Sequence, residues 1–390
     1  MKTCFSGQKR RLVNKKISIS ILALMFLAFF SVQNAFSQSE IDHNSHAEVE
    51  HADSSMLTSD STHATEQHAE DTHSEEAFNP ADMILHHIAD SYGWHLWDYT
   101  NKEGVVVPVE IPLPVILFTD GNLDVFMSSA FHHGHSTVQK GDRIYSLDHG
   151  HIVEESGLHP VDFSITKNVA SMLIAAFLLV LIFSAVGRGY KKRGIAAPKG
   201  IQALIEPIVV FIKDDIAIPN IGKDKYAKFL PYLLTVFFFI WINNLLGLIP
   251  FFPGGANVTG NIAVTLVLAV FTFLMTNING SKAYWKHVFA TPGVPVWLAP
   301  IMIPVELIGL LSKPFALMVR LFANITAGHI IILSLISLIF IFKTIAIAPV
   351  SVAFSLFMNV LELLVALLQA YIFTLLSALF IGMAVDDGHH

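Results

Sequence analysis

Two ionisable residues interrupt an apolar run near the C-terminal end of the sequence. Between Phe315 and Phe342 the only ionisable side chains are Arg320 and His329. An arginine at the centre of a bilayer costs roughly 2.5 to 3.5 kcal/mol even on lenient insertion scales, so a charge kept there normally faces water or a partner carboxylate. A snorkelling surface arginine is the alternative, but no helix end is expected within a turn or two. We therefore expect Arg320 to act on a charged group within the membrane.

Further polar residues lie at matching depths in this run and the next. If the run is helical, Glu306 lies about 21 Å before Arg320 and His329 about 14 Å after it. Antiparallel pairing with the next run then sets Gln369 level with Arg320 and Glu362 near His329. A His and a Glu at one depth can exchange a proton within the membrane. The alternative is two unrelated polar residues that face water.

Helical phase adds a second expectation for Arg320. At about 100° per residue it shares one stripe with mostly small residues. These are Ala316, Ala323, Asn324, Ala327 and Ser334. Small stripes usually mean tight helix packing. Because this stripe carries an arginine, the surface it packs on should offer a carboxylate, while His329, about 180° away, should face the other spans.

The composition is that of an integral membrane protein. Hydrophobic residues make up 53% of the chain and charged residues 14%. Five apolar segments are long enough to span: Asn168–Gly187, Leu230–Pro250, Gly260–Asn277, Pro300–Phe342 and Pro349–Val385. The last two are too long to stand upright, so we expect them to be tilted or broken. The stretch Ile201–Asp224, which contains two prolines, is typical of an interfacial helix. There is no basic domain for nucleic acid, and the single Cys4 excludes disulfides and thiolate metal sites.

Loop charges predict the orientation. The segments Arg188–Lys228 and Asn279–Trp297 hold nine and two Lys and Arg residues. The opposite loops, Phe251–Thr259 and Lys343–Ala348, hold one. The positive-inside rule then places the mature N-terminus outside and the C-terminus inside, which five crossings satisfy.

The first 163 residues divide into three parts. Residues 1–37 carry a basic stretch, an apolar stretch and small residues, which is typical of a secretory signal peptide; an uncleaved helix is the alternative. Residues 38–77 are rich in His, Ser, Asp and Glu, and we expect them to be disordered. Residues 78–163 predict a small mixed α/β domain on the outer side, peripheral to proton transfer.

Local patterns give this outer domain its expected elements. Met83–Tyr92 can form an amphipathic helix. Val115–Phe118 and Leu123–Met127 flank an Asp120-Gly121 hairpin turn, and Arg143–Leu147 is typical of another strand. Three aromatic residues suggest packing against the outer loops of the membrane part: Trp94, Trp97 and Tyr99.

Four ordered motifs resemble subunit a of the F-type ATP synthases. They are Leu310–Gly328, which contains Arg320 and Asn324, and Asn244–Pro250, Thr259–Thr265 and Leu368–Phe373. The resemblance covers residues 164–386, the predicted membrane domain, and implies a bacterial inner-membrane subunit. Familiar bacterial members carry a Glu where this chain has His329 and a His near Glu362. This exchange keeps both groups at one depth.

The resemblance implies a proton-translocating stator subunit that is not catalytic alone and needs no cofactor. Its partners would be the rotating ring of c subunits, the b-subunit peripheral stalk and lipid. Arg320 would be the essential arginine facing the ring, Gln369 the glutamine opposite it, and Glu306 the acid of the cytoplasmic half-channel. Protons would enter past His329 and Glu362.

Other classes of function have weaker support. A His-rich metal-ion transporter would explain residues 38–77, but it needs clustered ligands within the spans, where only His329 and Glu362 stand near each other. An intramembrane metalloprotease would need HExxH on a helix, which the sequence lacks. The choice between H⁺ and Na⁺ rests on the ring's carboxylate site and stays open.

Overall fold

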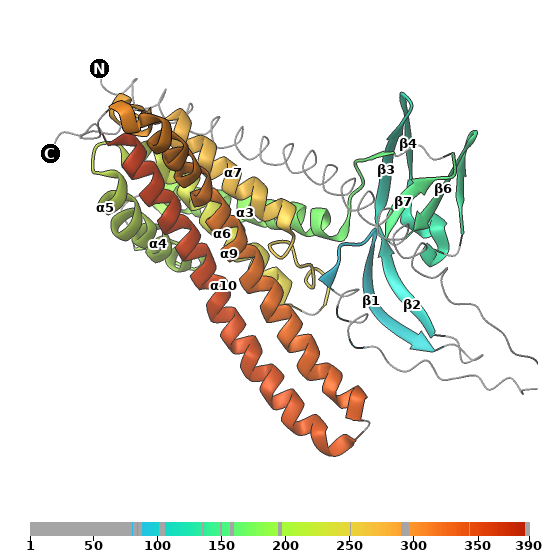
Figure 1. The fold of residues 1–390 in the computed structure, drawn as a ribbon. Helices are drawn as coiled ribbons and strands as arrows, with labels where there is room; N and C mark the ends of the chain where they lie inside the picture. Colours follow the sequence, from blue (N-terminus) through green and yellow to red (C-terminus); the bar gives the residue numbers. More distant parts are fainter. Residues whose placement is uncertain are drawn as a thin grey trace, which may run out of the picture.

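A β-rich part precedes a helical part in the computed structural model (Figure 1). The structure describes residues 80, 84 and 88–386, except 101–105, 135, 149, 157–159, 194–196, 250, 290–295 and 343. The predicted signal peptide and the His-rich segment therefore lie outside the described residues. Of the helix expected at Met83–Tyr92, Ile84 and Ile88 are helical, but Ala89 to Tyr92 are not, so the predicted C-terminal bound was wrong.

The described strands of the β-rich part form antiparallel pairs in three small sheets. The strand orders are β1-β2, β4-β3-β8 and β5-β6-β7. The bounds are β1 Gly93–Thr100, β2 Val106–Pro112, β3 Pro114–Thr119, β4 Asn122–Met127, the 3₁₀ turn η1 Ser128–Gly134, β5 Val138–Lys140, β6 Arg143–Asp148, β7 His151–Glu154 and β8 Val161–Asp162.

Turn chemistry explains the β3–β4 hairpin. Asp120 and Gly121 both have positive φ, at 47° and 79°, which the type I′ turn of a tight hairpin requires. Below the turn, Phe118 lies opposite Leu123. The predicted hairpin is confirmed, as is the strand predicted at Arg143–Leu147.

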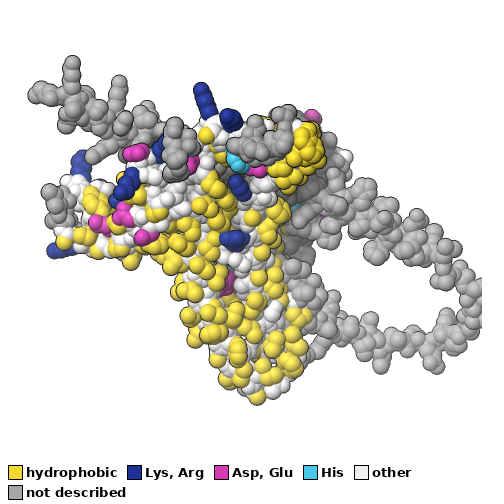
Figure 2. Space-filling view, turned by 60° about the vertical axis from the view of Figure 1, so that its left-hand side comes forward, with side chains coloured by type: hydrophobic (Ala, Val, Ile, Leu, Met, Phe, Trp, Pro, Cys, Tyr) yellow, Lys and Arg dark blue, Asp and Glu magenta, His cyan; other side chains and the backbone are white. Residues whose placement is uncertain are grey.

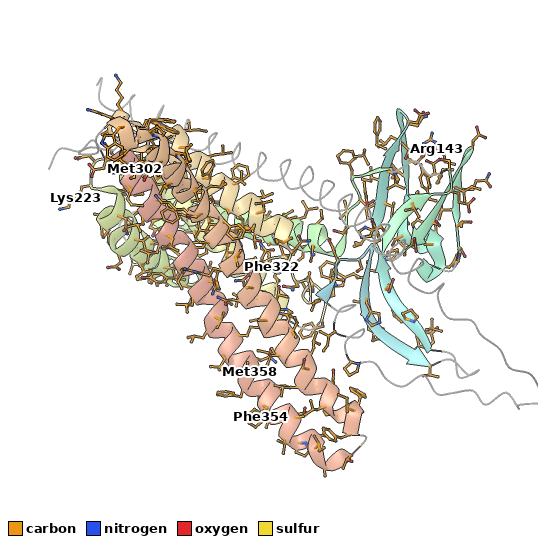
Figure 3. All side chains as sticks on the ribbon, viewed as in Figure 1. Arg143, Lys223, Met302, Phe322, Phe354 and Met358 are labelled. Atoms are coloured by element: carbon orange, nitrogen blue, oxygen red, sulfur yellow. The ribbon has the colours of Figure 1, made fainter. Side chains whose placement is uncertain are left out.

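A separate apolar cluster holds the β-rich part together. It consists of Val115, Leu117, Phe126, Phe131, Val138, Tyr145 and Ile152. At its edge the Arg143 guanidinium donates to Asp124 at 2.5 Å, and the Tyr145 hydroxyl donates to the same oxygen at 2.8 Å. Figure 3 labels Arg143 among the strands, far from Lys223 and Met302 at the opposite end of the helices.

The helical part follows directly. Its elements are α3 Lys167–Arg193, α4 Ile201–Phe211, the π-helix η2 Ile212–Ala217, α5 Ile218–Ile221, α6 Tyr226–Leu248, α7 Ile262–Ile278, α8 Lys282–Phe289, η3 Val296–Leu298, α9 Ala299–Phe342, η4 Ile345–Ile347 and α10 Ala348–Val385. They share one core, to which α3, α4, α6, α7, α9 and α10 all contribute.

Four described helices are long and apolar enough to cross a membrane: α3, α6, α9 and α10. A fifth span results if α7 and α8, which meet at 105°, are counted as one. The chain is therefore a polytopic membrane protein. The segment predicted as an interfacial helix forms α4, η2 and α5. α4 packs on α3, η2 packs on α6 and α10, and α5 packs on α10.

The two longest helices lie side by side and extend beyond the rest (Figure 1). α9 has 44 residues and α10 has 38, so each exceeds the roughly 30 Å apolar core of a bilayer by far at about 1.5 Å per residue. The run at Pro300–Phe342 was expected to be either tilted or broken. α9 is one unbroken helix that contains Pro304 and Pro314. The protruding end of the pair is covered with apolar side chains in Figure 2, including exposed Phe354 and Phe357.

A polar junction fixes the β-rich part to the first span. The Asp90 carboxylate accepts from the Asn168 backbone N–H at 3.0 Å and from the Thr166 hydroxyl at 2.8 Å. The carboxylate therefore caps the N-terminus of α3, where backbone N–H groups lack helical partners. Burial raises the pKa of the Asp90 carboxyl above its ordinary value of 3.8, against the lowering effect of these hydrogen bonds.

The aromatic residues of β1 have different environments. Trp94 is 3% exposed and belongs to the core of the helical part, as expected from the sequence. Trp97 and Tyr99 are 58% and 51% exposed, so the expectation that all three pack against the outer loops was wrong for these two. Both lie in the C-terminal half of β1, which among the described strands pairs with β2 alone.

Candidate functional site

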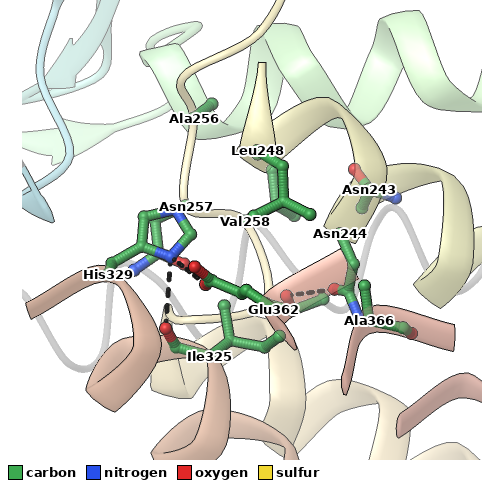
Figure 4. Close-up of a pocket in the computed structure, with 12 residues that line it drawn as sticks. Asn243, Asn244, Leu248, Ala256, Asn257, Val258, Ile325, His329, Glu362 and Ala366 are labelled. Carbon is green, nitrogen blue, oxygen red and sulfur yellow. Dashed lines mark hydrogen bonds and ion pairs between the residues drawn. The ribbon is translucent and has the colours of Figure 1, made fainter. Parts of the chain in front are cut away.

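His329 and Glu362 meet between the two long helices. His329 Nδ1 lies 2.8 Å from Glu362 Oε1 and 3.2 Å from the carbonyl oxygen of Ile325 (Figure 4). The His329 side chain is 14% exposed and that of Glu362 is 5% exposed. Gly328 makes the approach possible, because a Cβ at this position would stand 2.7 Å from Glu362 Oε1. The contact predicted from matching depth is present.

The pair lines a narrow, tightly packed pocket. Its walls come from α6, the α6–α7 loop, α9 and α10; the lining residues besides the pair are Asn243, Asn244, Gly247, Leu248, Ala256, Asn257, Val258, Thr259, Ile325 and Ala366. Glu362 Oε2 and Asn243 Oδ1 are buried and have no hydrogen-bond partner among the described residues. The pocket therefore presents acceptor atoms beside a group that can carry a proton.

Hydrogen bonds fix the floor of this pocket. The Thr259 hydroxyl donates to Asn244 Oδ1 at 2.5 Å, and Asn244 Nδ2 donates to the Ala366 carbonyl at 3.3 Å. The loop, α6 and α10 are thereby joined in one chain of bonds. Thr326 of α9 adds a longer bond of 3.4 Å to the carbonyl of Gly260.

Arg320 lies on the other face of α9. It is exposed, and the described part of the chain offers its guanidinium no hydrogen bond or ion pair. Ala316, Ala323, Asn324 and Ala327, which share its stripe, are exposed as well. The stripe predicted from helical phase is thus an open face of the single chain, and His329 points away from it into the pocket.

Gln369 does not share this exposure. Its side chain is 3% exposed within the helix packing, and no hydrogen bond joins it to Arg320 in the described structure. The described structure brings His329 and Glu362 together, but it does not bring Arg320 and Gln369 into a hydrogen bond.

Glu306 lies at the far end of α9 from His329. Its Oε1 is 3.5 Å from Nδ1 of His287 on α8, which makes an ion pair when this histidine is protonated. Between Glu306 and Arg320, Lys313 lines a second small pocket, together with Asn277 and Tyr284. Ionisable side chains therefore pair at two levels of α9, at Glu306 and at His329.

Comparison with known proteins decides the family. The family model "ATP synthase A chain" matches residues 169–382, more than half of the chain. The chain belongs to the ATP synthase A chain family. A second model, "Domain of unknown function (DUF8433)", matches residues 83–170.

Named relatives agree with this assignment. "ATP synthase subunit a" of Chloroherpeton thalassium is 55% identical over 235 residues, 59% of this chain and 69% of the relative. "ATP synthase subunit a 2" of Chlorobaculum tepidum is 53% identical over 240 residues, 58% and 66%. "ATP synthase subunit a" of Myxococcus xanthus is 48% identical over 236 residues, 59% and 76%. The matches span about two thirds of the first two relatives' own length.

Sequence reasoning missed part of the pocket of this A chain family member. Asn257, which is 5% exposed, accepts from the Gly260 N–H at 3.1 Å and lines the pocket beside His329. It lies in a loop between two spans, where no periodicity marks it. The Thr259–Thr265 motif was found, but the hydrogen bond of Thr259 to Asn244 could not be read from it.

Metal ligands are not grouped in the described residues. No three His, Cys, Asp or Glu side chains there are arranged to hold an ion. Residues 38–77, on which the metal-transport alternative rests, lie outside the described residues.

Proposed function

We propose that this chain is the proton-translocating stator subunit of a rotary F-type ATP synthase, with two half-channels that meet at a ring of c subunits. Family membership and the names of the relatives support the complex. The observation that carries the mechanism is the arrangement across α9. A buried His329–Glu362 pair lies on one side of α9. An exposed Arg320 lies on the other side, about 14 Å nearer the N-terminus of the helix.

Protons enter from the outer side at the pocket of His329 and Glu362. The unpartnered acceptors of Glu362 and Asn243 favour an incoming proton donor, and the short contact to His329 permits transfer between the pair. From there the proton passes the seam at Gly328 toward the stripe of Asn324. It neutralises a carboxylate of the ring, which can then turn into lipid without a buried charge.

Release occurs on the inner side. After nearly a full turn the carboxylate meets the path near Lys313 and Glu306 and loses its proton to the cytoplasm. Arg320 attracts the ionised carboxylate and blocks direct leakage between the half-channels, with Gln369 beside it. Each charge that crosses yields about 2.3 kcal/mol per 100 mV. Proton translocation drives ATP formation elsewhere in the complex, so this chain is not catalytic alone.

The setting follows from the same proposal. The chain lies in the bacterial inner membrane, crosses it five times and keeps its mature N-terminus outside and its C-terminus inside. Its domains end at residues 37, 77 and 163, and the first of them is a signal peptide. The membrane domain also contacts the b subunit of the peripheral stalk. The basic residues at the α5 end of the bundle, such as Lys223 in Figure 3, support the cytoplasmic side.

Replacement of Arg320 tests this function. Arg320→Ala should abolish ATP synthesis driven by an imposed proton gradient, while ATP hydrolysis by the soluble sector stays intact. Arg320→Lys should rescue poorly, because the ammonium lacks the guanidinium fork. Val319→Ala, an exposed apolar neighbour, is the matched control. Appreciable synthesis in Arg320→Ala membranes with normal subunit levels would contradict the proposal.

A further inference from the structure

The loop between α6 and α7 forms the outer wall of the His329–Glu362 pocket. Ala256 and Val258 are 0% and 1% exposed, so the loop folds inward instead of lying on the surface. Its first half is pressed against the end of α6: a Cβ at Gly254 would collide with the carbonyl oxygen of Ile249, and Gly255 adopts a φ of 78°. The carbonyl of Ala256 lies over Gly247, which also borders the His329 ring.

Trp94 of the β-rich part holds this loop from outside. Its Nε1 donates to the Gly254 carbonyl at 3.1 Å in a buried hydrogen bond. Its ring meets Phe252 edge to face, with centroids 5.2 Å apart and planes at 70°. Such pairs add to simple area burial, and a buried carbonyl that loses its donor is costly. Trp94 thus contacts the loop on two residues, and Ala256 of the pocket wall follows two positions later.

Hydrogen bonds hold the segment around Trp94 in place. The neighbouring Ser91 carbonyl accepts from the Lys167 N–H at 2.8 Å, and Asp90 caps α3. On the other side, Leu113 donates to the Tyr92 carbonyl at 3.3 Å. The segment that carries Trp94 is therefore fixed to the first span rather than free to move with the hairpin tip.

We propose that Trp94 is a positioning residue for proton access: it clamps the 251–258 loop so that Ala256 and Asn257 keep the wall of the His329–Glu362 pocket in place. The β-rich part, for which the matching family model states no function, then takes part in proton uptake through this contact. This inference rests on the proposed function. It also revises the sequence-based expectation that the outer domain is peripheral to proton transfer.

The test compares three variants of the full chain in the assembled complex. Trp94→Phe keeps an aromatic ring but removes the donor to Gly254, and Trp94→Ala removes both contacts. Trp97→Ala, on the same strand but 58% exposed, is the matched control. Passive proton flux is measured in vesicles stripped of the soluble sector, divided by the amount of this chain and of the ring, over a range of pH.

We expect Trp94→Ala to lower the flux per complex about tenfold, the result of one lost buried hydrogen bond and ring contact, and Trp94→Phe to lower it about threefold. The pH profile of proton flux in Trp94→Phe should shift because the pocket wall loosens. Trp97→Ala should match the parent chain in flux and in pH profile. Unchanged flux per complex and an unchanged pH profile in Trp94→Phe would overturn the inference, whatever the amount assembled, because only a structural role would remain.

Glu362→Ala in the same vesicles separates the two proposals. If Glu362→Ala blocks flux and the Trp94 variants do not, the clamp fails and the proposed function stands. If Glu362→Ala conducts like the parent chain, the proposed proton path itself fails.

Discussion

Removal of the Glu362 carboxylate should slow proton uptake strongly. In the structure His329 Nδ1 has two neighbours, Glu362 Oε1 at 2.8 Å and the Ile325 carbonyl at 3.2 Å. Glu362→Ala removes the shorter contact and the acceptor Oε2, which is buried and has no hydrogen-bond partner in the described part of the chain. Among the described residues, His329 then keeps only its contact with the Ile325 carbonyl of its own helix and loses the carboxylate with which it can exchange a proton.

The expected size follows from this contact. A hydrogen bond to a charged group contributes about 1.5 to 3 kcal/mol, which corresponds to roughly 10- to 150-fold in rate if it is lost at the limiting step. His329→Ala should fall in the same range, because it removes the other half of the pair. Leu363→Ala, which changes an exposed neighbour of Glu362, should stay near the parent rate.

The double exchange is the sharper test. His329→Glu with Glu362→His restores one acid and one imidazole at the same depth, and Gly328 leaves space beside position 362. We expect the double variant to recover part of the rate that either single replacement by Ala loses. Proton uptake is followed as gradient-driven ATP synthesis and as passive flux, each per assembled complex. If the double exchange is no better than the worse single variant, the two residues do not act as a pair.

Three further outcomes are expected. Gly328→Ala should push the Glu362 carboxylate away from His329, since a Cβ would stand 2.7 Å from Oε1; several-fold slower passive flux is expected, and flux at the parent rate would argue against the close fit. Burial raises the pKa of Asp90, so the folded junction should lose stability as pH rises from about 3.8 through the folded-state pKa, because the charged carboxylate is desolvated there. Asp90→Asn should remove this pH dependence of amide exchange at Asn168, and an unchanged dependence would refute it. Deletion of residues 38–77 should leave ATP synthesis nearly unchanged at normal subunit levels; a loss with and without added metal would show a role for this segment.

Local patterns in the sequence predicted much of the membrane part. The start of α3, the end of α10 and the extent of α9 lie within one or two residues of the apolar runs. Depth along antiparallel helices was enough to pair His329 with Glu362, because helical rise converts sequence position directly into distance. The Asp120-Gly121 turn was equally local, since two positive φ angles select these residue types.

Contacts between distant segments were not predictable in the same way. Trp94 and Gly254 are joined across 160 positions, and nothing in either segment marks the other. Trp94, Trp97 and Tyr99 are of similar type, yet only Trp94 meets the loop, because strand β1 leaves the membrane part after it. The burial of Gln369 and the exposure of Arg320 likewise depend on helix rotation, which composition does not fix.

The contact between the Arg320 stripe and the ring is the central claim, and site-directed photo-cross-linking tests it most directly. Cys4 is replaced, and a single cysteine with a photoreactive group is placed at Ala316 or at Phe315. These neighbours share one depth and are both exposed, but Phe315 points about 140° away from Arg320 and Ala316 only about 40°. The account predicts adducts with the ring subunit from Ala316→Cys and few from Phe315→Cys. Equal adducts from both positions, or more from Phe315→Cys, would contradict it.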